Sequence, residues 1–337
     1  MNTHVPIFID SGAFSAWTQK KPIDIDSYIA FLHEVLKKDK RMVYANLDVI
    51  GDGKASYQNW KEMRSQGLNP LAVYHINTDI KWLKKYLDRT AYVGIGAMAR
   101  TPDSKRRMAL DRIWGEFLTD SNGMPTIHVH GFGLASFELM GRYPWYSIDS
   151  TSWMIPGIYG KIYVPSRLNG EWRYDMKFVM GCSPDTSLRC WKGNHFENVG
   201  PLQRKNLMDY LKETGFKYGK SKVVDGEEEI VVPGISNDRD IRCFITALLF
   251  SRYVQTLKWP RAFTRRGGLF KQVDQRKAKA GISSNTLLYL GATGFPIEEK
   301  IRTRPEDFPG FGILVSFFDM GNETDRQRLE KAIKENR

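Results

Sequence analysis

Short apolar runs alternate with amphipathic segments through the first half of the chain. The apolar runs have the length and composition of buried strands, and they lie at residues 5–10, 42–50, 71–75, 91–96, 126–130 and at the run that ends at Asp149. Between them, apolar residues recur at helical spacing over residues 26–36, 57–66, 79–87 and 104–118. Strands and helices are therefore expected in regular succession.

This succession predicts an α/β fold in which parallel strands are joined by right-handed crossovers. A closed TIM-type (β/α)8 barrel and an open doubly wound sheet both fit the pattern. We favour the barrel, because polar residues end nearly every strand, as they do around a barrel mouth. The turn after the first strand also lacks the Gly-x-Gly-x-x-Gly pattern of dinucleotide-binding folds.

The second half of the chain has a less regular pattern. Residues 155–200 are rich in Gly, Pro, Tyr and Trp and are expected to form long loops, and the charged segment 215–235 is expected to protrude as a loop or hairpin. We expect one barrel domain over residues 1–337 that carries these two segments as insertions. The remaining elements are predicted as helices at 201–214 and 238–259 and as strands at 285–291 and 311–318.

The charge balance points to a polyanionic partner. The 337 residues carry a formal net charge of +12 and a pI near 9.4, which favours nucleic acid as the partner, although a basic metabolic enzyme fits as well. The segment 257–279 combines basic residues with aromatic ones, and Arg265, Arg266 and Lys271 are its candidate phosphate contacts. A solvated surface is the alternative interpretation of this segment.

The composition also limits the location of the protein. No run of about 18 apolar residues occurs, so a membrane span is not expected. A strand follows directly on the polar first residues, so a signal peptide is not expected. Three cysteines do not form a disulfide framework, and a reducing cytoplasm is the expected compartment.

Polar residues at successive strand ends form the candidate site. They are Asp10, Asp48, His75, the Gly94–Gly96 turn, His130 and Asp149. In a parallel barrel these positions surround one mouth. A carboxylate at a buried strand end is costly unless it is paired or used, so Asp10 and Asp149 suggest acid/base or covalent chemistry between them. Asp48 is suited to accept hydrogen bonds from the edge of a purine, and glycine lets a ligand approach the backbone closely.

Five of these elements, in order, resemble the motifs of the tRNA-guanine transglycosylases. Asp10–Phe14 is similar to the family's Asp-Ser-Gly-Gly-Phe, and Leu47–Val49 to its Phe-Asp-Glu. His75 stands where the family has a glutamine-bearing strand end. Val93–Met98 resembles the family's glycine-rich strand, and His130–Gly133 followed by Asp149 resembles its Met-Gly-Val-Gly and nucleophilic aspartate. The resemblance covers about residues 5–153.

Two departures from that family are similar instead to the DpdA-type enzymes, which insert 7-deazaguanines into DNA in bacteria and their viruses. The family's Asp-Cys-Val-Met-Pro-Thr-Arg segment is replaced here by Asp149–Trp153, and its Cys-x-Cys-x-x-Cys zinc motif is absent. The residues nearest to a zinc set are Cys182, Cys190, His195 and Cys243, for which we favour ordinary buried thiols over a metal site. No cofactor is therefore expected.

The resemblance implies a base exchange in which guanine in DNA is replaced by a 7-deazaguanine such as preQ0. It makes Asp149 the nucleophile and Asp10 the general acid and base. It assigns binding of the base to Asp48, His75 and the backbone of Gly94, Ile95 and Gly96. Trp153 is a candidate for stacking on the nucleic acid, and the target nucleotide must leave the base stack. The host cytoplasm is the expected location if the chain is viral.

Other interpretations fit the same residues. Within the same chemistry, tRNA is the alternative substrate, and a catalytically inactive barrel that binds nucleic acid is an alternative of another class. A metal-dependent hydrolase is a third alternative, because His128 and His130 lie on one face of a strand. Each residue also has a purely structural interpretation. Asp10 and Asp149 could cap turns, Asp48 could form an ion pair, and His75 could be a hydrogen-bonded core histidine.

Overall fold

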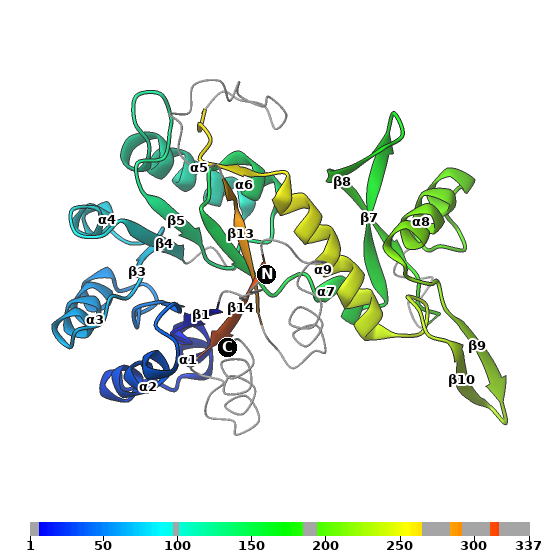
Figure 1. The fold of residues 1–337 in the computed structure, drawn as a ribbon, viewed down its shortest axis with the longest axis horizontal. Coiled ribbons are helices and arrows are strands. Elements are labelled where there is room, and N and C mark those ends of the chain that lie inside the picture. The colour runs from blue at the N-terminus through cyan, green and yellow to red at the C-terminus, as the bar shows by residue number, and fades with distance from the viewer. Residues whose placement is uncertain (1–6, 97–100, 185–193, 265–283, 292–310, 317–337) are drawn as a thin grey trace. The chain divides into compact units, whose positions relative to one another are not determined.

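The computed structural model describes residues 7–96, 101–184, 194–264, 284–291 and 311–316 (Figure 1). Contacts divide the chain into two compact units. Unit 1 comprises residues 1–150, 257–294 and 301–337, and unit 2 comprises residues 151–256 and 295–300. Both segments that were expected as insertions, 155–200 and 215–235, belong to unit 2.

Unit 1 is built on one sheet of eight strands, in the order β2-β1-β14-β13-β6-β5-β4-β3. Every neighbouring pair in this sheet is parallel, which confirms the prediction of a mixed α/β fold with parallel strands. The strands are β1 (Ile7–Asp10), β2 (Val43–Tyr44), β3 (Ala72–His75), β4 (Tyr92–Gly96), β5 (His128–Gly131), β6 (Ser147–Ser150), β13 (Leu287–Gly291) and β14 (Phe311–Ser316).

The two strands at the ends of this order, β2 and β3, are linked just beyond their bounds. A parallel bridge joins Ala45 to Leu71. The amide of Asn46 donates to the carbonyl of Leu71 over 2.9 Å, and the amide of Leu71 donates to the carbonyl of Tyr44 over 2.8 Å. Backbone hydrogen bonds thus join the end of β2 and the residues that follow it to Leu71, the residue just before β3.

Helices follow the strands of unit 1, and aspartates begin three of them. Asp24, Asp52 and Asp79 accept hydrogen bonds from backbone amides at the first turns of α2, α3 and α4. The helices of this unit are α1 (Ala13–Gln19), α2 (Ile25–Lys38), α3 (Gly53–Ser65), α4 (Ile80–Leu87), α5 (Asp103–Ile113), the π-helix η1 (Trp114–Leu118) and α6 (Phe137–Arg142).

The strand that was predicted over residues 42–50 is much shorter in the structure. Only Val43–Tyr44 is a strand, and the chain then passes through the buried Asn46 into a loop. The side-chain oxygen of Asn46 accepts from the amide of Val73 over 2.7 Å, and its amide group donates to the carbonyl of Ser56 over 3.2 Å. These side-chain bonds replace ladder bonds and fix the loop that carries Asp48.

Unit 2 contains two hairpins and three helices among its described residues. Its core includes Ile162, Met180, Leu207 and Ile245. The elements are α7 (Ile155–Ile158), β7 (Lys161–Leu168), β8 (Glu171–Gly181), α8 (Pro201–Thr214), β9 (Lys220–Val224), β10 (Glu227–Val232) and α9 (Arg239–Gln255). The predicted helix at 201–214 is confirmed, that at 238–259 ends earlier, and segment 215–235 contains the hairpin β9-β10.

The prediction of long loops over residues 155–200 is wrong. Strands β7 and β8 pair as an antiparallel hairpin. Its turn is Asn169-Gly170, and both residues have positive φ values, 51° and 84°. Asn-Gly is a strong signal for this kind of two-residue turn, because both residues tolerate the left-handed region.

No helix in the described part of the chain has both the length and the apolar character that crossing a bilayer requires.

Candidate active site

Three predicted carboxylates come together in unit 1. The strands β1 and β6 and the loop after β2 carry Asp10, Asp149 and Asp48, respectively. Asp10 keeps partial exposure, but the protein around its carboxyl desolvates it. Burial, followed by the negative charges of Asp48 and Asp149, raises the pKa of Asp10 to about 8, against the opposing effect of the amides of Ser11 and Gly12. Asp10 is therefore suited to hold a proton at neutral pH beside two other carboxyl groups.

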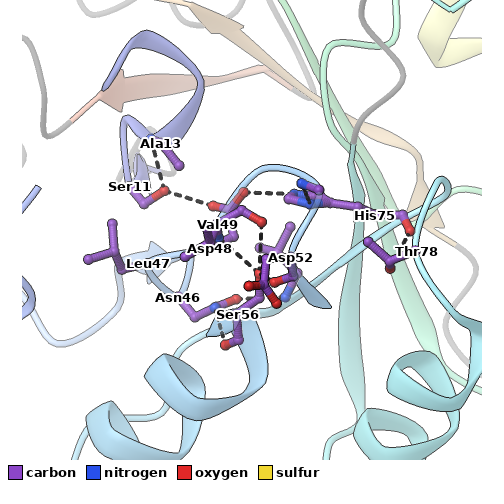
Figure 2. A network of polar contacts seen from close by, with 12 residues as sticks. Ser11, Ala13, Asn46, Leu47, Asp48, Val49, Asp52, Ser56, His75 and Thr78 are labelled. Carbon is purple, nitrogen blue, oxygen red and sulfur yellow. Dashed lines mark hydrogen bonds and ion pairs between the residues drawn. The ribbon is translucent and has the colours of Figure 1, made fainter. Parts of the chain in front are cut away.

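Asp48 uses both of its oxygens within a buried network (Figure 2). The hydroxyl of Ser11 donates to Oδ1 over 2.9 Å, and Nε2 of His75 lies 2.8 Å from Oδ2. The amide of Gly51 donates to Nδ1 of His75 over 3.4 Å. Because Nδ1 accepts a hydrogen bond, a neutral His75 carries its proton on Nε2 and donates it to Asp48.

Asp149 uses its oxygens differently. Its Oδ1 accepts from the amide of Gly133 over 2.8 Å and lies 3.2 Å from Nε2 of His130. Among the described residues, no hydrogen bond reaches its Oδ2. The amide of Leu134 donates to the backbone carbonyl of Asp149 over 2.8 Å, so the turn after β5 holds both the backbone and one carboxylate oxygen of this residue.

A polar chain continues behind His130. Its Nδ1 lies 2.7 Å from the hydroxyl of Ser147, which also contacts the hydroxyl of Tyr92. His130 and Ser147 are fully buried, and Asp149 is 6% exposed. The ring of His130 stacks on Phe8 with 4.6 Å between centroids, so an aromatic contact holds its plane as well.

The predicted glycine turn lies on β4, beside His75. A Cβ on Gly96 would lie 2.9 Å from Cδ2 of His75, and a Cβ on Gly94 would lie 2.4 Å from the ring of Phe132. Close packing inside the protein therefore accounts for both glycines, and Ile95 between them is buried. Base binding by this turn stays a prediction.

A pocket of about 680 Å³ opens beside Asp48. Its volume is within the range of about 300–1,000 Å³ that small-molecule sites occupy. The indole of Trp17 at this pocket is 51% exposed, and its ring centroid lies 6.0 Å from that of Phe14, which is 42% exposed. The pocket is lined by Ala13, Ala16, Trp17, Thr18, Lys20, Pro22, Ile23, Leu47, Asp48, Val49, Ile50 and Asn59.

The two cysteines of the candidate zinc set that the structure describes, Cys182 and Cys243, are buried free thiols. Cys182 donates to the carbonyl of Ile235 over 3.2 Å, and burial raises the pKa of its thiol to about 12. Burial also raises the pKa of Cys243 to about 11, whereas zinc binds thiolates. His195 lies with Nε2 3.2 Å from the carbonyl of Ser183, and Cys190 lies outside the described residues. In the described ranges, no group of three or more His, Cys, Asp or Glu residues is arranged to hold a metal ion.

His128 lies away from the carboxylates of the site. Its ring centroid lies 4.7 Å from that of Trp259 and 4.2 Å from that of Tyr146. Only His130 of the predicted His-x-His pair contacts Asp149. The pair thus does not form the two-histidine arrangement that a metal-dependent hydrolase would need.

The predicted nucleic-acid contacts have mixed outcomes. Trp153 belongs to unit 2 and is fully buried there, which is typical of a packing residue rather than a stacking surface. Arg265, Arg266 and Lys271 lie outside the described residues. In the part of segment 257–279 that the structure describes, Arg261 donates to the carbonyl of Gly141 over 2.7 Å.

The sequence interpretation gave no role to Ser11, Ser147 or Tyr92 and no definite role to His130. Ser147 stands two residues before Asp149 on the same strand, so the two side chains share a face. Ser11 follows Asp10 directly, within the motif that supported the family resemblance. The sequence thus places Ser11 and Ser147 next to the predicted aspartates. Their hydrogen-bond partners, however, depend on contacts between strands that are distant in sequence.

Comparison with known proteins gives no match: neither a protein-family model, nor a curated protein, nor a solved structure matches this chain.

Proposed function

We propose that this protein is a transglycosylase that exchanges guanine in DNA for a 7-deazaguanine base, and that the strands of unit 1 close into a (β/α)8 barrel around the site. The support for closure is the parallel bridge between Ala45, just after β2, and Leu71, just before β3, because these two strands are at the ends of the sheet order. In a closed barrel, Asp10, Asp48 and Asp149 lie at the mouth formed by the carboxyl ends of the strands.

The different environments of Asp10 and Asp149 are the observation that carries the proposal. The pKa of Asp10 is raised to about 8, so this group is a proton donor at neutral pH. Asp149 receives hydrogen bonds on Oδ1 from Gly133 and His130, and no hydrogen bond among the described residues reaches its Oδ2. A carboxyl group that holds a proton, beside a carboxyl group with an oxygen open to a ligand, suits the roles of acid and nucleophile.

The reaction that we propose conserves atoms and charge without a redox step. Oδ2 of Asp149 forms a bond to C1′ of the target nucleoside as the bond from C1′ to guanine breaks. The bonding electron pair leaves with guanine, which takes the proton of Asp10. The incoming 7-deazaguanine then gives its ring proton to Asp10 as its nitrogen attacks C1′, and Asp149 is released as a carboxylate.

The pocket beside Asp48 is the proposed place for the heterocycle. Its volume of about 680 Å³ accommodates a purine-sized base with room for a substituent. Both oxygens of Asp48 are already fixed by Ser11 and His75, but each keeps a further lone pair for a ring N–H or an amino group. Trp17 offers an exposed aromatic face at the same pocket.

The choice of DNA rests on the sequence. The net charge of +12 favours a polyanionic substrate, and the segment after Asp149 departs from the pattern of the tRNA enzymes. The same base-exchange chemistry acts on either polynucleotide once the target base is out of the stack. The experiment that tests the proposal therefore uses both DNA and tRNA as substrates.

Exchange of labelled guanine tests the proposal. The full chain is incubated with radiolabelled guanine and with single-stranded DNA, duplex DNA or tRNA, and the products with preQ0 are identified by nucleoside mass spectrometry. We expect incorporation into DNA by the wild type and none by Asp149→Asn. Incorporation only into tRNA would show that tRNA, and not DNA, is the substrate. Binding of DNA without any exchange would instead identify a catalytically inactive barrel.

A further inference from the structure

His130 stands where the resembled family has methionine, and it connects Asp149 to the hydroxyl of the buried Ser147 and, through it, to the hydroxyl of the half-buried Tyr92. It lies on β5, between β6, which carries Ser147 and Asp149, and β4, which carries Tyr92. In the sheet register, His130 is directly opposite Ser147. The contacts run from Asp149 Oδ1 to Nε2 (3.2 Å), from Nδ1 to the hydroxyl of Ser147 (2.7 Å), and from there to the hydroxyl of Tyr92.

The number of available protons determines which group donates and which accepts in these hydrogen bonds. Burial raises the pKa of Tyr92 well above its ordinary value, so its hydroxyl keeps its proton. In the described part of the protein, the hydroxyl of Ser147 is the hydrogen-bond partner of Tyr92, and it therefore accepts this proton. The single proton of Ser147 is then directed to Nδ1 of His130.

A neutral His130 whose Nδ1 accepts from Ser147 must carry its own proton on Nε2. This proton faces Oδ1 of Asp149. If Ser147 instead donated to Tyr92, the hydroxyl of the half-buried Tyr92 would have no acceptor among the described residues, which is costly. The two hydroxyl groups thus select one tautomer of the histidine.

We infer that His130, oriented by Ser147 and Tyr92, is a positioning residue that fixes Oδ1 of Asp149 and presents Oδ2 to C1′ of the substrate. The inference rests on the proposed function. The amide of Gly133 holds the same Oδ1 over 2.8 Å, so two donors define the plane of the carboxylate. A neutral donor orients the carboxylate without pairing it with a full positive charge, which leaves Oδ2 nucleophilic.

The hydrogen-bonded series from Tyr92 through Ser147 to His130 has the same role in both half-reactions. When Oδ2 is bonded to C1′, Oδ1 becomes the carbonyl oxygen of the ester and still accepts from Nε2 of His130. When the incoming base displaces the ester, the carboxylate that leaves is formed against the same two donors, so its negative charge is stabilised as it appears. Neither half-reaction changes the protonation of His130.

Two histidines on one strand provide a matched test. His130→Phe keeps the ring that stacks on Phe8 and removes both nitrogens, whereas His128→Phe makes the same change at a ring that packs on Trp259 and Tyr146. Exchange of labelled guanine into single-stranded DNA gives kcat and KM, and denaturing gels give the rate at which the covalent adduct forms.

We expect His130→Phe to lower kcat and the rate of adduct formation by at least about tenfold with KM nearly unchanged. His128→Phe should match the wild type.

Smaller changes separate positioning from packing. Ser147→Ala removes the hydroxyl that selects the tautomer, and we expect kcat to fall by about tenfold, with recovery in Ser147→Thr, which restores a hydroxyl. Tyr92→Phe should give a weaker loss of kcat. It also serves as the readout if the changes at His130 or Ser147 prevent folding, which thermal melting detects.

The outcomes distinguish this inference from the proposed function. Adduct formation at the wild-type rate in both Ser147→Ala and Tyr92→Phe would overturn the positioning role, as would a change confined to KM. If the wild type itself neither exchanges guanine nor forms an adduct with DNA or tRNA, the proposed function fails, and the inference fails with it.

Discussion

Two aspartates of the site, Asp48 and Asp149, each pair with a buried histidine, yet their oxygens are used in different ways. Both oxygens of Asp48 have protein donors, the hydroxyl of Ser11 on Oδ1 and His75 on Oδ2. Asp149 has both of its described carboxylate contacts on Oδ1, from the backbone amide of Gly133 and from Nε2 of His130. The same pair of residue types therefore fixes one carboxylate completely and leaves one oxygen of the other available to a ligand.

Under the proposed function, this difference suits the two carboxylates to different tasks. A carboxylate that is held through both oxygens keeps its position when a ligand arrives, which suits recognition of a base edge. A carboxylate that is held through one oxygen can form a bond with the other, which suits nucleophilic attack. Asp10 interacts with both of them, where a proton donor can serve the leaving base.

Removing the proposed nucleophile gives the largest expected effect. Asp149→Asn keeps the size of the side chain but replaces Oδ1 or Oδ2 by a weakly nucleophilic amide. Exchange of labelled guanine should fall by roughly three orders of magnitude or more, and the adduct that survives denaturant should disappear. If Asp149→Asn keeps an exchange rate within tenfold of the wild type, Asp149 is not the nucleophile.

Asp10 should act through its proton, so its effect depends on pH. Because its pKa is about 8, the acid form is present below that pH and is lost above it. We expect release of guanine to be nearly independent of pH up to neutrality and to decline as the pH rises through about 8. Asp10→Asn should lose about 100-fold or more in turnover while it still binds DNA. A rate that rises through pH 8 would exclude the role of Asp10 as the acid.

The stability of the same variant tests whether Asp10 is merely a structural cap. The folded protein holds the proton of Asp10 up to about pH 8, whereas the unfolded chain releases it near the ordinary pKa of an aspartate, 3.8. The unfolded state therefore binds fewer protons between these values, so the contribution of Asp10 to stability declines as the pH rises across that window. Asp10→Asn should raise the melting temperature relative to the wild type at pH 7, with a smaller difference at pH 4. A lower melting temperature at both pH values would indicate a cap.

The sequence was sufficient to find the carboxylates but not their partners. Asp10 and Asp149 end short apolar runs, and the carboxyl ends of parallel strands meet at one edge, so their proximity was predictable. The donors to Asp149 depend on the register of β5 and β6, which places His130 opposite Ser147 and which no local pattern reveals. The hairpin β7-β8 was also predictable, because Asn169-Gly170 is a turn signal and the residues from Trp172 to Phe178 alternate strictly between apolar and charged side chains.

Asp48 should affect recognition of the base more than chemistry. Asp48→Asn replaces an acceptor by a donor at one position, and this change opposes both the contact with His75 and the proposed contact with the base. We expect KM for guanine and for preQ0 to rise by about 10- to 100-fold, the usual range for loss of a hydrogen bond to a charged group, with a smaller change in kcat. Isothermal titration with the free base checks the same effect without turnover. Comparable losses of kcat in Asp48→Asn and Asp149→Asn would remove the distinction between the two sites.

Trp17 gives the smallest expected effect and tests on which side of the site the heterocycle binds. Its indole is half exposed at the pocket beside Asp48. Stacking of a base on an aromatic side chain contributes about 1–3 kcal/mol, so Trp17→Ala should raise KM for the base by several-fold to about 100-fold. Trp17→Phe keeps an aromatic face and should restore most of the affinity. Adduct formation between Asp149 and DNA should change less than KM, since Trp17 is assigned to the base rather than to C1′. Unchanged KM in Trp17→Ala would place the heterocycle outside this pocket, and the Asp48 side would then lose its role in recognition.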